Sequence, residues 1–190
     1  MTASATAAPL PRARTMMHPG PVGKIRIDHL HAERGRHLRL ALEPGRTLHD
    51  AIVEPLRARG IRSASMTILG GEVSTLLFCV APPDPSGERV ANYTRPIDVG
   101  AATLIFGNAT LGWSRGEPVV HCHAAFACAD GTVRGGHIVV DRSLVGTPMP
   151  VLATSLDGIE LRITHDPETQ MPLMRPFAAP AAEREASHAV

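Results

Sequence analysis

The sequence predicts a single α+β domain, with a largely antiparallel sheet of about seven strands and one principal flanking helix. Short apolar runs rich in β-branched residues recur along most of the chain, and clusters of Gly, Pro, Asn and Asp separate them. Only one stretch has the apolar periodicity of a helix. A length of 190 residues suits one domain, and a hydrophobic content of 44% is enough for a core.

The helix and the strand before it have the clearest patterns. Leu38, Leu40 and Leu42 alternate along HLRLALEP, which predicts a half-buried strand. Thr47 is the expected N-cap of the helix, and Pro55 should kink or break it, because the proline ring displaces a backbone hydrogen bond. The apolar stripe of this helix comprises Leu48, Ala51, Ile52 and Leu56.

The remaining strands are expected between turn signals. Residues 25–29 would add a short strand before the domain, and Gly107-Asn108 should divide residues 97–113 into two strands. The other expected strands cover residues 63–69, 72–80, 119–128, 132–140, 152–153 and 158–163.

We expect three regions: a flexible basic N-terminal arm (1–35), the folded domain (36–176) and a disordered C-terminal tail (177–190). Residues 1–39 carry seven Lys or Arg and two acidic residues, whereas the rest of the chain carries 12 basic and 16 acidic residues. The body is therefore mildly acidic, which argues against a nucleic-acid footprint on it, so the arm would supply any weak DNA contact.

One tripeptide at the end of the arm, Arg34-Gly35-Arg36, resembles the core of an AT-hook, whose arginines enter the minor groove of DNA. His37 stands where that motif has a proline, and the segment runs directly into a strand. The favoured interpretation is a solvated lead-in to the strand.

Composition and motifs narrow the function classes. Aromatic residues make up only 3%, so stacking platforms for single-stranded nucleic acid are not supported. No GxxxxGK loop, nucleophile elbow or GxGxxG fingerprint occurs. The 3 cysteines form no CxxC pair, and no apolar segment has the length of a signal peptide or a membrane span. We therefore expect a cytoplasmic protein with no membrane contact.

The stretch VVHCHAAFACADGTVRGGHIVV is the most informative part of the chain. Two runs of strand-like composition flank Asp130-Gly131, a strong turn signal, which predicts a hairpin. His121 and His123 project from the same face of the first strand, with Cα atoms roughly 6.5 Å apart. His137 follows on the returning strand. Three neutral histidines around one open position are typical of a catalytic zinc site.

Strand register decides whether the third histidine can join the pair. A two-residue loop would set His137 opposite Ala124, on the wrong face. A three-residue loop over residues 129–131, with Gly131 left-handed in a G1 bulge, would set His137 opposite His123.

A structural role for these histidines is the alternative to metal binding. With 10 histidines in the chain, a His-x-His pair arises readily by chance, and His29 and His31 form a second one with no strand partner in view. The three histidines of the hairpin could equally be core or interface residues satisfied by hydrogen bonds.

The hairpin run HCHAAFACADGTVRGGHIVV resembles the signature of the PPC domain (plants and prokaryotes conserved, also written PCC), which has a His-x-His strand, an Asp-Gly turn and a Gly-Gly-His. The likeness extends upstream through LRLALEPGRTLHDAIVEPLRARGIRSASMTILGGEVSTLLF and downstream to HDPETQMPLM, covering residues 36–176. It implies a homotrimer of a compact domain. Plant members join this domain to an AT-hook, and prokaryotic members carry a DNA-binding label inherited from those relatives.

Two function classes remain open. The resemblance implies a DNA-binding or regulatory trimeric module with a three-histidine metal-type site. The alternative is a zinc-dependent hydrolase or lyase acting on a small carbonyl substrate, because zinc or a similar divalent ion polarises a carbonyl or activates water. Acetolactate decarboxylases are similar in fold, and they hold zinc with a His-x-His strand and a later histidine. Candidates for an acid, a base or an anion clamp are Glu72, Asp130 and Arg134.

Overall fold

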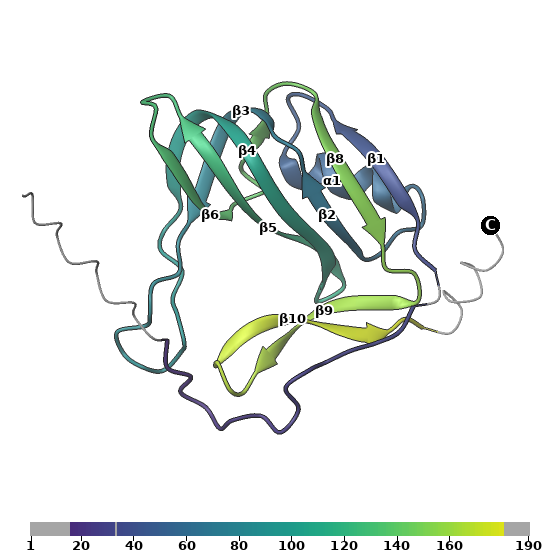
Figure 1. Ribbon diagram of the computed structural model, residues 1–190, viewed down its shortest axis with the longest axis vertical. Coiled ribbons are helices and arrows are strands. Elements are labelled where there is room, and N and C mark those ends of the chain that lie inside the picture. The colour runs from purple at the N-terminus through teal and green to yellow at the C-terminus, as the bar shows by residue number, and fades with distance from the viewer. Residues whose placement is uncertain (1–15, 33, 181–190) are drawn as a thin grey trace, which may run out of the picture.

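The computed structural model describes residues 16–32 and 34–180 (Figure 1). One helix and ten strands occur within these residues, so the predicted fold class is confirmed and the predicted number of strands was too low. In chain order they are β1 (His37–Leu42), α1 (Leu48–Arg57), β2 (Ala64–Ile68), β3 (Gly71–Cys79), β4 (Ile97–Ser114), β5 (Glu117–Cys128), β6 (Val133–Ile138), β7 (Leu144–Val145), β8 (Met149–Ser155), β9 (Ile159–Asp166) and β10 (Met171–Ala178).

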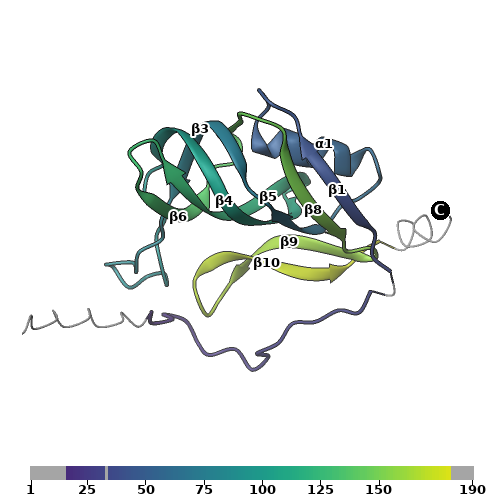
Figure 2. The ribbon, with the colours of Figure 1, turned by 45° about the horizontal axis from the view of Figure 1, so that its top comes forward.

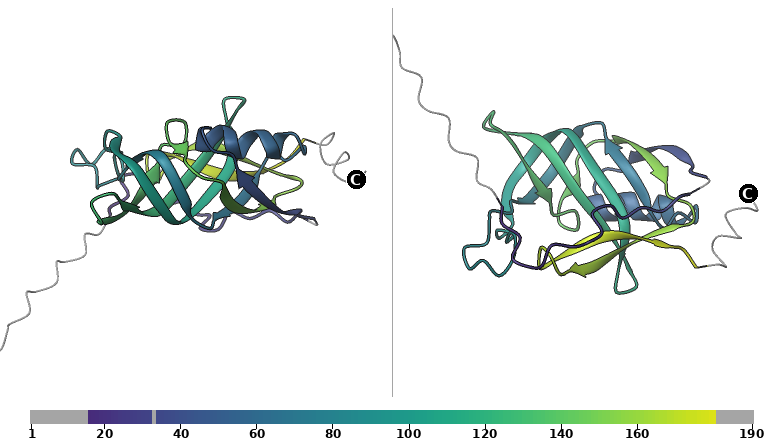
Figure 3. Two further views of the ribbon diagram at one scale, coloured as in Figure 1. Left: turned by 90° about the horizontal axis from the view of Figure 1, so that it is seen from above. Right: turned by 60° about the horizontal axis from the view of Figure 1, so that its bottom comes forward.

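The ten strands form one sheet, in which eight follow the order β1-β8-β2-β4-β5-β6-β3-β7, and β10 pairs with β9, which joins the sheet at β4. All pairs are antiparallel apart from a single parallel contact between β4 and β9. Because β3 pairs with both β4 and β6, strands β3 to β6 form a closed circuit. Figure 3 shows α1 against one face of this sheet, beside β1 and β8. The core lies between helix and sheet and includes Leu48, Ile52, Leu56, Leu111, Phe126 and Met149, each no more than 1% exposed.

Helix α1 buries the predicted stripe, and its N-cap is Thr47, whose hydroxyl accepts a hydrogen bond from the backbone N–H of Asp50 at 3.0 Å. The expected break at Pro55 is wrong, because α1 continues to Arg57. Proline has no N–H to donate to the Ala51 carbonyl, and buried side chains on both sides of the proline hold the helix against the sheet. At ten residues, α1 is too short to cross a bilayer, and the described chain contains no other helix.

The expected turn at Gly107-Asn108 is also wrong, because β4 is continuous for 18 residues. Gly107 pairs with Ala124 of β5, and a Cβ on Gly107 would lie 3.2 Å from the Ala124 Cβ. The glycine therefore serves close strand packing rather than a turn. A register shift between Leu104 and Phe106 marks a bulge nearby, and the strand remains paired on both sides of it.

Residues 16–32 contain no helix or strand, so the strand expected at residues 25–29 is wrong. The side chains of Ile25 and Ile27 are 76% and 77% exposed, so they contribute no packing that would hold this segment in a strand. The segment runs along the β9–β10 hairpin (Figure 2), where Glu168 accepts hydrogen bonds from the Gly23 N–H at 2.9 Å and from the Arg26 guanidinium at 2.5 Å. Residues 1–15 and 181–190 of the predicted arm and tail lie outside the described residues, and β10 extends to Ala178.

The β5–β6 hairpin has the three-residue loop. The Cys128 N–H donates to the Thr132 carbonyl at 2.8 Å, and Gly131 has a φ of +81°. From this loop the register sets His123 directly opposite His137. Of the two registers that the sequence allowed, the structure adopts the one that places all three histidines on one face.

The left-handed glycine of this loop gives a test of the register. Gly131→Val should destabilise the protein by about 1–2 kcal/mol or more, because a β-branched side chain is disfavoured at positive φ. Gly131→Asn should cost much less, because asparagine tolerates this conformation. Urea denaturation of both variants measures the difference. Equal stability of the two variants would contradict the bulge.

Candidate metal centre

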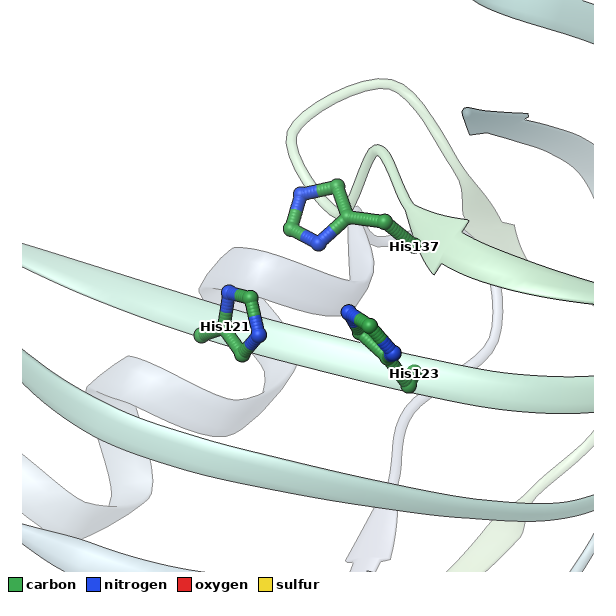
Figure 4. Close-up of side chains that lie close together, drawn as sticks. All are labelled: His121, His123 and His137. Atoms are coloured by element: carbon green, nitrogen blue, oxygen red, sulfur yellow. The ribbon is translucent and has the colours of Figure 1, made fainter. Parts of the chain in front are cut away.

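The three histidines lie together on the open face of the sheet, opposite the face that α1 covers (Figure 4). Along β5 the even-numbered residues 120–126 are buried, which leaves His121 and His123 on the other face. The ring centroid of His121 lies 4.8 Å from those of both His123 and His137, and the His123–His137 distance is 5.4 Å. One nitrogen from each ring lies within 4.8 Å of the other two. Small side-chain rotations would bring the three nitrogens to one ion at the roughly 2.0–2.1 Å of a zinc–imidazole bond.

The polar atom that most needs a partner in this cluster is Nδ1 of His137. It is buried, and no hydrogen-bonding group of residues 16–32 or 34–180 contacts it. Burial, followed by the charges of His121 and His123, lowers the pKa of His137 to about 4. Burial and the neighbouring His123 also lower the pKa of His121. Both rings are therefore neutral at pH 7, as metal coordination requires, and a buried nitrogen without a hydrogen-bond partner suits a metal ligand.

A cleft of about 360 Å³ opens beside His121 and His137. Strand β6 pairs with residues 123–127 of β5, and the cleft lies beside the residues of β5 that precede His123 and have no partner on β6. Around the two histidines its polar wall consists of His49, Cys79, Tyr93 and Asp141. A small molecule entering this cleft would lie against two of the three imidazoles.

Sequence reasoning missed the contribution of Tyr93 and Cys79. The Tyr93 ring lies 5.0 Å from the His137 ring, and Cys79 is the cross-strand partner of His137. Burial raises the pKa of both groups, so both are neutral at pH 7. Cys79 was recognisable only as one residue of an apolar run, and Tyr93 follows a loop whose path no sequence pattern defines.

His49 is the fourth histidine of the region and comes from the first turn of α1. Its Nδ1 lies 2.9 Å from an Asp50 carboxylate oxygen and 3.8 Å from one of Asp141. Its Nε2 lies 3.4 Å from the Pro118 carbonyl oxygen. Surrounded by these acceptors, His49 borders the cleft without joining the three-histidine cluster.

The three charged candidates from the sequence lie elsewhere. Glu72 is at the start of β3, beside a separate hollow that Gly146 also lines. Asp130 is at the tip of the hairpin, where its carboxylate accepts hydrogen bonds from Thr132. Arg134 pairs with Phe126, on the opposite face of β6 from His137. None of the three lines the histidine cleft.

The cysteines of the hairpin occupy the other face of β5. Cys122 is fully buried, and burial raises the pKa of its thiol to about 12. Cys128 packs against the same core. All three cysteines of the chain are free thiols.

Comparison with solved structures identifies the same fold in other proteins. A metal-containing protein from Archaeoglobus fulgidus superimposes with a TM-score of 0.61 at 20% identity, over 79% of this chain and 99% of that one. A plant- and prokaryote-conserved (PPC) protein from Pyrococcus horikoshii gives 0.56 at 19% identity, over 79% and 100%. A "Putative DNA-binding protein" from Ralstonia eutropha JMP134 gives 0.56 at 19% identity, over 72% and 88%.

The sequence itself identifies the family. No curated protein matches the chain. Residues 30–157 match the Plants and Prokaryotes Conserved (PCC) domain, and this range contains the His-x-His strand, the Asp-Gly turn and the Gly-Gly-His. Since the match covers more than half of the chain and the fold agrees, this protein belongs to the PCC, or PPC, domain family.

Proposed function

We propose that this PPC-domain protein binds a divalent metal ion, zinc or a similar ion, through His121, His123 and His137, and that it serves as a regulatory, DNA-associated module. One observation carries the metal proposal: three imidazoles converge on one face, and the buried Nδ1 of His137 has no hydrogen-bond partner in the described chain. Imidazole nitrogen is a preferred ligand of zinc. The metal-containing relative from Archaeoglobus fulgidus supports the same proposal.

The alternative proposal is a metal-dependent hydrolase or lyase acting on a small carbonyl substrate. The cleft beside His121 and His137 favours it, because this space could admit a small molecule next to the metal ligands. A bound ion of this kind supplies Lewis acidity toward a carbonyl or a water molecule. Within the cleft, Tyr93 and His49 are the side chains placed to orient a ligand, whereas Glu72, Asp130 and Arg134 lie outside it.

Metal content tests both proposals. Protein purified without chelators should carry close to one zinc or similar ion per chain, measured by inductively coupled plasma mass spectrometry. The His123→Ala variant should lose this ion, because two imidazoles hold an ion far more weakly than three. His29→Ala combined with His31→Ala is the matched control, since this exposed His-x-His pair lies outside the cluster. Wild-type protein without metal would contradict the metal site and the enzyme alternative together.

The DNA-associated part of the proposal rests on the family resemblance and on two structural neighbours that are each described as a "putative" DNA-binding protein. Lys24 and Arg26 belong to the basic segment upstream of the domain, and the Arg26 guanidinium already pairs with Glu168. Residues 1–35 contain five Lys or Arg in all, so the arm can contact only a few phosphates. We therefore propose weak, non-specific duplex binding, with dissociation constants of roughly 10⁻⁴ to 10⁻⁶ M at physiological salt.

Neutralising the arm tests this proposal without shortening the chain. Replacing Arg12, Arg14, Lys24 and Arg26 with glutamine should weaken duplex binding and flatten its salt dependence, by about 0.9 in slope for each phosphate that is no longer neutralised. Fluorescence anisotropy at several salt concentrations measures both quantities. Nanomolar, sequence-selective binding that survives the four substitutions would show that another surface recognises DNA.

We also propose that the protein is a cytoplasmic homotrimer, as the family resemblance implies. Ile105 and Phe106 of β4 are 50% and 47% exposed, which suits a surface that a second chain covers. Gly136 permits β6 to approach β3 of the same chain closely, because a Cβ on Gly136 would lie 2.6 Å from the Cys79 carbonyl oxygen. The three free thiols support a reducing compartment.

Light scattering at micromolar concentration tests the assembly. Wild-type protein should show three times the 20.2 kDa chain mass, and Ile105→Asp combined with Phe106→Asp should reduce it, because buried unpaired carboxylates destabilise an interface. Leu173→Asp on β10 is the control for an exposed apolar residue outside that surface. A monomeric wild type would overturn the proposal.

A further inference from the structure

A second cavity, of about 830 Å³, lies at the opposite end of α1 from His49. The C-terminal end of the helix, the entry to β1 and the β8–β9 turn enclose it. None of the residues that line it belongs to the histidine cleft. Five of them are arginines from two separate parts of the sequence: Arg34, Arg36, Arg57, Arg59 and Arg62.

The segment that leads into β1 is fixed against β8 at this cavity. The Arg36 N–H donates to the Ser155 hydroxyl at 2.8 Å, and the Ser155 N–H donates to the Arg36 carbonyl at 2.9 Å. A Cβ on Gly35 would lie 3.0 Å from the Ser155 carbonyl oxygen, so only glycine fits here without a shift of the backbone. The Arg-Gly-Arg tripeptide therefore belongs to the wall of a cavity.

Arg36 is already committed within the protein. Its Nε and Nη2 donate to the two carboxylate oxygens of Asp157 at 3.1 and 2.8 Å, and its Nη1 donates to the Arg59 carbonyl at 2.7 Å. An arginine bound in this way cannot enter a minor groove as an AT-hook arginine does. Arg36 instead supports the cavity wall.

Other arginines of the cavity are free to bind a ligand. The side chains of Arg34 and Arg57 make no hydrogen bond or ion pair with any residue in 16–32 or 34–180, and Arg59 uses one nitrogen on the Pro55 carbonyl. The lining contains two carboxylates, of which Asp157 pairs with Arg36 and Glu160 pairs with Arg62 at 2.8 Å. The described lining thus has a formal surplus of three positive charges, which outweighs the partial negative charge of the helix C-terminus.

One wall of the cavity is apolar and aromatic. Trp113 is 9% exposed, its indole N–H donates to the Arg62 carbonyl at 2.9 Å, and the Arg62 guanidinium lies 3.9 Å from its ring centroid. Ile61, Leu156 and Ile159 complete this wall. A ligand that fills the cavity would place its charge on the arginines and its uncharged part against this wall.

We propose that this cavity binds a phosphorylated small molecule of the size of a mononucleotide. The volume matches ligand sites of this class, which span roughly 300–1,000 Å³. Several guanidinium groups suit phosphate, because their planar N–H forks bind its oxygens in pairs. A surplus of three positive charges favours a di- or trianion over a monocarboxylate. The concave shape and the commitment of Arg36 favour a small molecule over a duplex.

Trp113 is the only tryptophan of the chain, so its fluorescence reports on the cavity directly. With excitation at 295 nm, titration of the full-length protein with ADP should change the emission and saturate. Arg57→Gln and Arg34→Gln should each weaken binding about tenfold, which corresponds to the loss of one charge-assisted hydrogen bond. Arg39→Gln, an exposed arginine on β1 outside the cavity, should leave binding unchanged.

Parallel titrations with inorganic pyrophosphate and a short DNA duplex separate the sources of phosphate. Saturable binding of ADP that depends on Arg34 and Arg57 supports the proposal, and weaker binding of pyrophosphate would assign the remaining affinity to the apolar wall. His123→Ala should bind ADP normally, so the result is independent of the metal proposal. No saturable ADP binding, equal weakening by Arg39→Gln, or binding of the duplex alone would each overturn the proposal.

Discussion

The pairing of His123 with His137 across β5 and β6 is the contact on which the candidate metal centre depends. A shift of one residue would turn His137 to the core face, where Phe126 and Ile138 are buried. Such a shift would place an imidazole in the apolar core and expose apolar side chains, which costs several kcal/mol. The packing energy that stabilises the sheet therefore also holds the three histidines together. The left-handed conformation of Gly131 allows the three-residue loop that this register requires.

Much of the fold could be predicted, because its local signals agree with its tertiary contacts. The Thr47 cap, the buried stripe of α1 and the alternation in β1 all appear where the sequence places them. Gly107 was mistaken for a turn residue because a glycine that permits strand packing and one that forms a turn look alike in sequence. Strand β10 escaped prediction because Pro172 and Pro176 are unusual in strands. They are tolerated here because, among the described strands, β10 pairs with β9 alone.

The candidate sites differ in how far the sequence could reveal them. The His-x-His spacing placed His121 and His123 together because strand geometry is local, whereas the partnership with His137 depended on which of two loop conformations the hairpin adopts. The arginine cavity escaped prediction because net charge averages over the whole chain. The folded domain has more acidic than basic residues. Its arginines nevertheless gather where the segment leading into β1, the C-terminal end of α1 and the β8–β9 turn meet.

Glu168 joins two distant parts of the chain through a single side chain. Its carboxylate contacts His18, Gly23 and Arg26, and the N–H of Gly23, ahead of the two side chains, lowers the pKa of Glu168 to about 2. The carboxylate therefore keeps its charge throughout the physiological pH range. Residues 18–26 are tethered to the β9–β10 turn by contacts that converge on this one group, together with the Gly20 N–H that donates to the Glu168 backbone carbonyl. Asp28 adds a contact with Arg175 of β10 at 3.8 Å. The segment upstream of the domain is therefore attached to both the turn and the second strand of the β9–β10 hairpin, and most of its polar contacts with the turn end on one residue, Glu168.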